Sequence, residues 1–118
     1  MAKAAIREKE EDVTVERTEG SVYHALGYED ADEMERKSRL VSSINETIDA
    51  MGLTQVQAAE IVGIDQPTLS KLLRGRFRSV SLDKLADMLN ALGRDVTIVV
   101  GGMPRDKNVR GRTLVAIS

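Results

Sequence analysis

Residues 53–75 read LTQVQAAEIVGIDQPTLSKLLRG, and this stretch decides the fold. Thr54 and Gln57 match a capping box, in which each side chain satisfies an otherwise free backbone N–H at the start of a helix. The pattern predicts a short helix over residues 55–62. Gly63 follows directly, and its freedom to take the left-handed conformation favours a tight turn at that point.

A second short helix is predicted after this turn. Asp65 stands at its N-cap position, and Pro67 is tolerated in the first turn because the N–H groups there have no partner within the helix. The helix is expected to run to about Arg74 and to end at Gly75. Two short helices that are joined by a tight turn and packed at a steep angle form a helix-turn-helix.

The spacing of small and apolar residues supports this motif. Counted from Gln55, the small Ala59 is fifth, where the two helices approach closely. Gly63 is ninth, where the backbone must turn with positive φ. Apolar residues at the tenth, fifteenth and eighteenth positions are expected to bury one side of the second helix and to leave its opposite face exposed. These residues are Ile64, Leu69 and Leu72.

Longer helices flank the motif on both sides. The apolar residues between about Asp30 and Met51 recur with a helical period, which predicts a first long helix. After a basic loop, residues 74–80 (RGRFRSV), Ser81 is expected to cap a further helix that Gly93 ends. The apolar stripe of the first helix consists of Met34, Val41, Ile44, Ile48 and Met51, and that of the last helix of Leu82, Leu85, Ala86, Leu89 and Leu92.

The two ends of the chain differ from this helical centre. Residues 95–100 (DVTIVV) are rich in β-branched side chains and predict a strand, and residues 113–117 predict a second short one. Charged residues dominate the N-terminus, so we expect residues 1–19 to be a flexible acidic arm. The predicted division is this arm, a domain over residues 20–100 that includes the strand, and a polar tail over residues 101–118. The expected fold is mainly α, with four to five helices and a short C-terminal strand.

Composition excludes several classes of protein. The chain has no cysteine, so disulfides and thiolate metal sites are absent. His24 is the single histidine, and it lacks a second histidine for a metal site. No apolar run approaches the roughly 20 residues that span a bilayer. The N-terminus has no apolar stretch typical of a secretion signal. We therefore expect a cytoplasmic protein that is not an enzyme, binds no cofactor and does not enter a membrane.

The charge is unevenly distributed. The net charge is −2, but residues 1–35 hold 4 basic and 11 acidic residues, a net of −7. The remainder holds 13 basic and 8 acidic residues, a net of +5. Residues 71–78 contain four cationic side chains and no acidic one: Lys71, Arg74, Arg76 and Arg78. This asymmetry indicates an anion-binding face joined to an acidic segment, and the alternative is a loop whose charges only solvate it.

Residues 34–93, and above all residues 53–75, resemble the DNA-binding domain of Cro/cI-type phage repressors, the XRE family. The resemblance implies a lambda-repressor-like fold whose second motif helix lies in the major groove of double-stranded DNA, with its N-terminal residues on the base edges. Carried over by position, it implies that Gln55 contacts phosphate and braces the reading helix. The implied base readers are Gln66, Thr68, Ser70 and Lys71.

Individual positions refine this expectation. Gln66 suits adenine, whose N6 and N7 atoms a glutamine can bond together. Pro67 stands where some relatives present a hydroxyl, which puts a base contact from that residue in doubt. Arg74, Arg76 and Arg78 suit phosphates, which position a protein without reading sequence. The alternatives are a purely structural helical bundle, arginines that only confer solubility, and a silent surface glutamine.

A partner subunit is also expected. One motif covers few base pairs, so repressors of this type bind as homodimers to half-sites about 34 Å apart. An unpaired strand over residues 95–100 would be satisfied by an antiparallel copy from a second subunit. The alternative is pairing within the chain, with residues 13–16 or 113–117.

Residues 20–100 are similar in layout to antitoxins of the host-inhibition-of-growth (HigA) type. This resemblance implies a type II antitoxin that neutralises a RelE-like toxin and represses its own operon. The acidic residues 1–35 would then cover a basic toxin surface. A stand-alone phage-like repressor and a protein-only adaptor domain are the alternatives.

Overall fold

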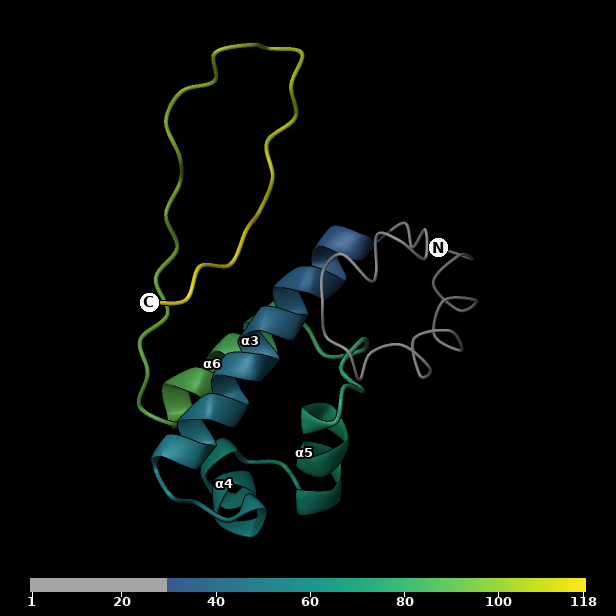
Figure 1. Cartoon of the computed structure of the whole chain (residues 1–118), viewed down its shortest axis with the longest axis vertical. Coiled ribbons are helices and arrows are strands. Elements are labelled where there is room, and N and C mark those ends of the chain that lie inside the picture. Colours follow the sequence, from purple (N-terminus) through teal and green to yellow (C-terminus); the bar gives the residue numbers. More distant parts are fainter. Residues whose placement is uncertain (1–29) are drawn as a thin grey trace.

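The computed structural model describes residues 30–118, and the regular secondary structure in this range is helical (Figure 1). The long helix α3 (Ala31–Ala50) is followed by α4 (Gln55–Val62), α5 (Gln66–Leu73) and α6 (Leu82–Ala91). Helix α6 packs along α3, while α4 and α5 lie close to each other across the end of this pair. The predicted mainly α architecture is therefore confirmed, and the described residues contain four helices.

The core lies between α3, α6 and the two short helices. Four members of the predicted α3 stripe are buried, whereas Met51, at the C-cap beyond the last helical turn, is 48% exposed. Full burial of one large apolar side chain contributes about 1.5–3 kcal/mol, so this shared core holds the helices in place. Its largest fully buried side chains are Met34, Ile44, Leu69, Leu72, Phe77, Leu85 and Met88.

Local signals set the helix boundaries of the motif. The Thr54 hydroxyl accepts a bond from the Gln57 N–H (3.1 Å), and the Gln57 side-chain oxygen accepts one from the Thr54 N–H (2.9 Å). Gly63 has a φ of 83° and donates its N–H to the Ala59 carbonyl at 2.9 Å. The predicted capping box and glycine turn are both confirmed.

The other helix starts differ from one another. Ser81 caps α6 as expected, because its hydroxyl accepts a bond from the Lys84 N–H at 3.0 Å. Asp30 and Asp65 occupy N-cap positions, but neither side chain makes a capping bond. The Asp30 carboxylate instead forms an ion pair with Arg78, so its position before α3 serves a tertiary contact.

Phe77 is the largest departure from the predicted helical core. The sequence places it between two arginines in a basic loop, yet its side chain is fully buried in the core. Buried beneath this loop, it fixes residues 74–80 onto the helical body. The loop is consequently a packed element and not a solvated connection.

The predicted C-terminal strands are not formed in the described part of the chain. After α6 the chain runs outward as an arm and then returns towards α3 (Figure 1). Residues 95–105 make no backbone hydrogen bond in residues 30–118, and residues 113–117 also lack strand pairing. A β-branched sequence becomes a strand only when a neighbouring strand satisfies its N–H and C=O groups, and residues 30–118 supply no such neighbour.

Two further expectations concern the N-terminal residues and membrane spans. The predicted acidic arm, residues 1–19, and His24 lie outside the described residues. Among the described helices, none is long and apolar enough to cross a membrane.

Candidate nucleic-acid interface

Helix α5 has one buried face and one exposed face. Leu69 and Leu72 are buried against the core, as their spacing predicts. Thr68 and Lys71, on the other side, are exposed, whereas Gln66 and Ser70 are half-buried. All four predicted base readers therefore lie on α5 with at least part of each residue accessible. The buried leucines anchor the helix to the core, and its polar side chains face the solvent.

The two predicted glutamines meet at the N-termini of the two motif helices. Gln55 is the first residue of α4 and Gln66 the first of α5. The Gln66 amide nitrogen donates to the Gln55 side-chain oxygen at 3.0 Å. This bond restrains the rotamer of Gln66 before any ligand arrives, which lowers the entropy lost when a ligand is bound. The structure thus brings the residue predicted to brace and the residue predicted to read bases into direct contact.

Three cationic side chains surround the C-terminal end of α5. Lys71 lies in its last turn, Arg74 is its C-cap, and Arg76 follows in the loop. All three are exposed, and none forms an ion pair with another residue of the described chain. Unneutralised cations around a polar helix face provide the electrostatic attraction that a polyanion requires.

Arg78 does not belong to this cationic group, contrary to the sequence-based prediction. Its guanidinium Nη1 lies 2.6 Å from the Asp30 carboxylate, and only 9% of its side chain is exposed. Burial and neutralisation by Asp30 leave Arg78 unsuited to a phosphate contact. We therefore remove it from the predicted DNA-binding residues.

Comparison with known proteins gives the family. A family model described as a helix-turn-helix domain matches residues 22–101. A solved structure assigned as an XRE family transcriptional regulator is 37% identical, with a TM-score of 0.67. The alignment covers 75% of this chain and 99% of the other. This chain belongs to the XRE-type helix-turn-helix family. No curated protein matches it.

The first resemblance predicted from residues 53–75 is confirmed at the level of this family. The match to the helix-turn-helix family model ends at residue 101, so residues 102–118 lie beyond it. The similarity to HigA-type antitoxins is a finer statement, and it stays a prediction.

A buried lysine holds the basic loop of this XRE-type domain, residues 74–80, in place. The Lys37 ammonium donates to the Arg78 backbone carbonyl at 2.6 Å and lies 3.5 Å from the Glu33 carboxylate. Lys37 is only 5% exposed, although it lies on α3 three residues after Met34, on the apolar side. Together with the Asp30–Arg78 ion pair, this bond fastens the loop to α3. We call these two contacts the loop clamp.

Sequence reasoning missed Lys37, but a signal for it was present. Charged residues are almost never fully buried unless they are paired. A lysine within a helical apolar stripe must therefore either point away from the core or find a buried acceptor. Position 37 falls on the stripe that includes Met34 and Val41, and the acceptor is the carbonyl of Arg78.

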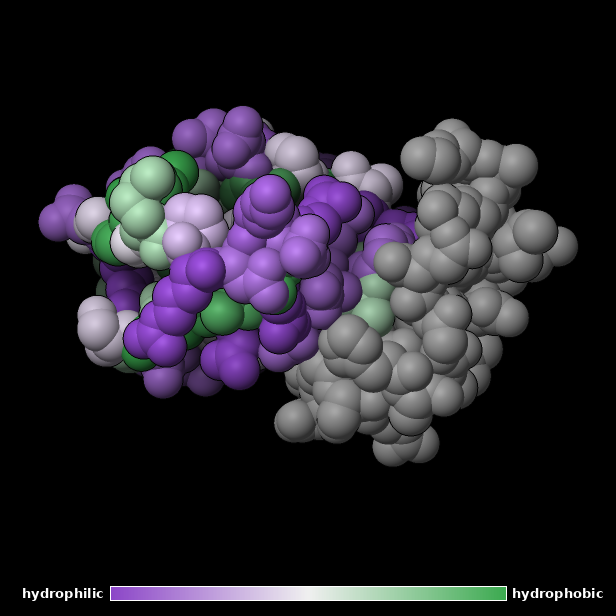
Figure 2. All heavy atoms as spheres, turned by 90° about the horizontal axis from the view of Figure 1, so that it is seen from above, coloured by the Kyte–Doolittle hydropathy of each residue, from purple (hydrophilic) through white to green (hydrophobic). Residues whose placement is uncertain are grey.

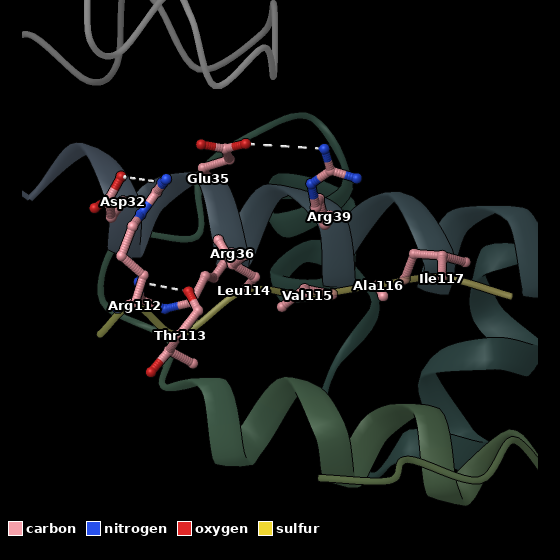
Figure 3. A pocket seen from close by; sticks show the side chains of 10 residues that line it. All are labelled: Asp32, Glu35, Arg36, Arg39, Arg112, Thr113, Leu114, Val115, Ala116 and Ile117. Atoms are coloured by element: carbon pink, nitrogen blue, oxygen red, sulfur yellow. Dashed lines mark hydrogen bonds and ion pairs between the residues drawn. The ribbon is translucent and has the colours of Figure 1, made fainter. Parts of the chain in front are cut away.

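A cavity of about 420 Å³ lies between α3 and the returning tail (Figure 3). Arg112 pairs with Asp32 at 3.1 Å, and Arg36 donates to the Thr113 carbonyl at 3.1 Å. Arg39 also pairs with Glu35 at 3.8 Å, so each charged side chain that lines the cavity contacts a neighbouring side chain or carbonyl. Within residues 30–118 no cluster of three side chains could hold a metal ion.

Proposed function

We propose that this XRE-type protein is a sequence-specific DNA-binding transcriptional regulator that reads the major groove with α5. One observation carries the proposal: α5 buries its leucines and presents a polar face on which Gln66 is already oriented by Gln55. An α-helix with such a face fits the major groove, where each base pair displays a distinct pattern of donors and acceptors. The similar protein assigned as an XRE family transcriptional regulator supports the same role.

The side chains divide into readers and positioning groups. Gln66, Thr68, Ser70 and Lys71 face the bases in this proposal, with Gln66 the natural partner of adenine. Gln55 braces Gln66 and contacts phosphate at the start of α4. The exposed Arg74 and Arg76 bind phosphates on the flank of α5, where they fix the register of the helix without reading sequence.

The first experiment selects preferred sequences from a random pool of duplexes and measures affinity by fluorescence anisotropy. Gln66→Ala should relax the preference at one base position and weaken binding to the preferred site by about 1–3 kcal/mol. Asn45→Ala serves as the matched control, because Asn45 is an exposed amide on α3. If Gln66→Ala kept both the preferred sequence and the affinity, α5 would not be the reading helix.

A second experiment compares two arginines that are close in sequence but differ in environment. Arg76→Ala should weaken binding to all duplexes alike and reduce the slope of log K against log salt by about 0.9. Arg78→Ala should reduce that slope less than Arg76→Ala does, because Asp30 already neutralises the Arg78 guanidinium. Equal loss of slope in both variants would contradict these assignments.

Binding as a homodimer is part of the proposal, since one α5 contacts only a few base pairs. Two copies related by a two-fold axis would read a palindromic operator with half-sites about 34 Å apart. Footprinting on a selected site tests this arrangement. Protection of two half-sites supports it, and a single short footprint contradicts it.

We also propose that the regulator is the antitoxin of a type II pair, which binds a RelE-like toxin. The support is the net charge of −7 over residues 1–35, which suits a basic protein surface, together with the layout of residues 20–100. Co-expression with the products of adjacent genes tests the proposal. A stable complex that relieves growth arrest supports it, whereas the lack of any complex favours a stand-alone repressor. An adaptor domain would bind protein but no duplex.

A further inference from the structure

We propose that residues 95–105, the outgoing limb of the C-terminal arm, pair with the same residues of a second copy in antiparallel orientation, about a two-fold axis at Val100. The inference deepens the proposed function and rests on its homodimer. The sequence raised pairing within the chain, with residues 113–117 or 13–16, as the alternative. Pairing with residues 113–117 does not occur, because the tail at residues 112–113 contacts α3 instead, and residues 13–16 lie outside the described residues. Within residues 30–118, the outgoing limb has no backbone partner.

The limb exposes more apolar surface than isolated surface residues account for. Ile98, Val99 and Val100 are consecutive and 83–90% exposed, and Met103 is 91% exposed. Figure 2 views the molecule from above, the direction in which the arm of Figure 1 projects, and it shows hydrophobic patches among a largely hydrophilic surface. Single exposed hydrophobic residues are common, but a contiguous group marks an interaction surface.

The backbone of the limb also lacks partners. Residues 95–105 make no backbone hydrogen bond in the described chain, although Val96, Thr97 and Ile98 have strong β propensity. An extended segment with unpaired N–H and C=O groups is a template for another strand. Strand addition would satisfy the backbone groups and cover the apolar side chains in one step.

Charge complementarity identifies the added strand as a second copy of the same segment. Asp95 and Arg105 lie five residues to either side of Val100 and are exposed. Neither forms an ion pair with a described residue. Antiparallel pairing about Val100 places Asp95 of each copy opposite Arg105 of the partner subunit, at both ends of the ladder. Opposite charges in directly facing positions stabilise an antiparallel pair.

The same register accommodates the proline and separates the two faces. If the central Val100 pair is of the non-hydrogen-bonded type, Pro104 also falls on such a position, where its missing N–H is tolerated. Side chains alternate along a strand, so Val96, Ile98 and Val100 then share one face with Pro104. In the dimer, both copies would place this face on the same side of the two-stranded ladder and so form one continuous apolar surface.

The test is a charge exchange measured by sedimentation equilibrium on the full chain without DNA. Asp95→Arg and Arg105→Asp should each raise the dimer dissociation constant by about tenfold or more, because each places like charges opposite each other. The double variant, which exchanges the two charges, should restore the wild-type constant. Ile98→Lys should abolish dimerisation, and circular dichroism checks that its helices remain folded.

Each outcome decides the proposal. Wild-type protein that stays monomeric at high concentration overturns it, and so does a double variant that is no tighter than the single ones. Affinity for a duplex that contains a single half-site tests the proposed DNA binding independently of dimerisation. Ile98→Lys should keep half-site binding. If the wild-type protein did not bind the half-site duplex, the DNA proposal would be refuted, whereas the dimer measurement would still stand.

Discussion

Replacing Asp30 with asparagine tests the loop clamp directly. The Asp30 carboxylate lies 2.6 Å from the Arg78 guanidinium, and the two side chains are 18% and 9% exposed. Asparagine keeps the size of the side chain but removes its charge, so the buried Arg78 guanidinium loses its ion pair with residue 30. Breaking a buried ion pair from one side costs roughly 3–5 kcal/mol. The residual exposure of Asp30 places the expected loss near the lower end of that range.

Asp32→Asn is the matched control, because the same change is made two residues away in an exposed ion pair. The Asp32 and Arg112 side chains are 43% and 56% exposed, and their nitrogen and oxygen atoms lie 3.1 Å apart. Exposed pairs contribute about 0–1 kcal/mol, and salt screens them further. The two variants should therefore differ clearly in stability although their chemistry is identical.

Urea denaturation followed by circular dichroism measures both variants. With an m value of about 1–3 kcal/mol/M, the unfolding midpoint of Asp30→Asn should fall by roughly 1–3 M. Asp32→Asn should shift it by a few tenths of a molar unit. If the two midpoints moved equally, burial would not set the strength of the Asp30–Arg78 contact, and the assignment of Arg78 to the fold would fail.

Three further substitutions have definite expected outcomes. Phe77→Ala should lower the free energy of unfolding by about 3–5 kcal/mol in a thermal or urea melt, and a loss below 1 kcal/mol would mean that the loop is not packed. Gly63→Ala meets no atom within 4 Å, so its cost is backbone strain at φ 83° alone. That cost is about 1–2 kcal/mol by the same melt, and no loss would contradict the left-handed turn. Thr54→Ala removes the cap of α4 and should cost about 0.5–2 kcal/mol, whereas the exposed Asn45→Ala should cost much less.

The helices could be predicted from the sequence because the signals that set them are local. The capping box at Thr54 and Gln57 and the hydroxyl cap at Ser81 involve residues three positions apart. Gly63 acts through its own backbone conformation. Interactions over such short distances need no knowledge of the rest of the fold, so the residues that make them can be identified directly.

The C-terminal segment and the role of Arg78 depend on distant parts of the chain, which local patterns do not contain. β propensity at residues 95–100 states that a strand is suitable but not which strand pairs with it, and the described chain supplies none. Arg78 differs from Arg76 through contacts with distant residues, among them its ion pair with Asp30, 48 residues away. Composition groups the two arginines together, whereas the fold separates them.

Phe77 explains why this separation occurs and why it matters for the proposed DNA contacts. The side chain of Phe77 enters the core, Arg76 before it stays in solvent, and Arg78 after it lies along the start of α3. The Lys37 ammonium then holds the Arg78 carbonyl from the same helix. The position of Arg76 beside α5 is therefore set by buried contacts on the far side of the loop. Changes in the clamp should displace a phosphate contact that none of the clamp residues makes.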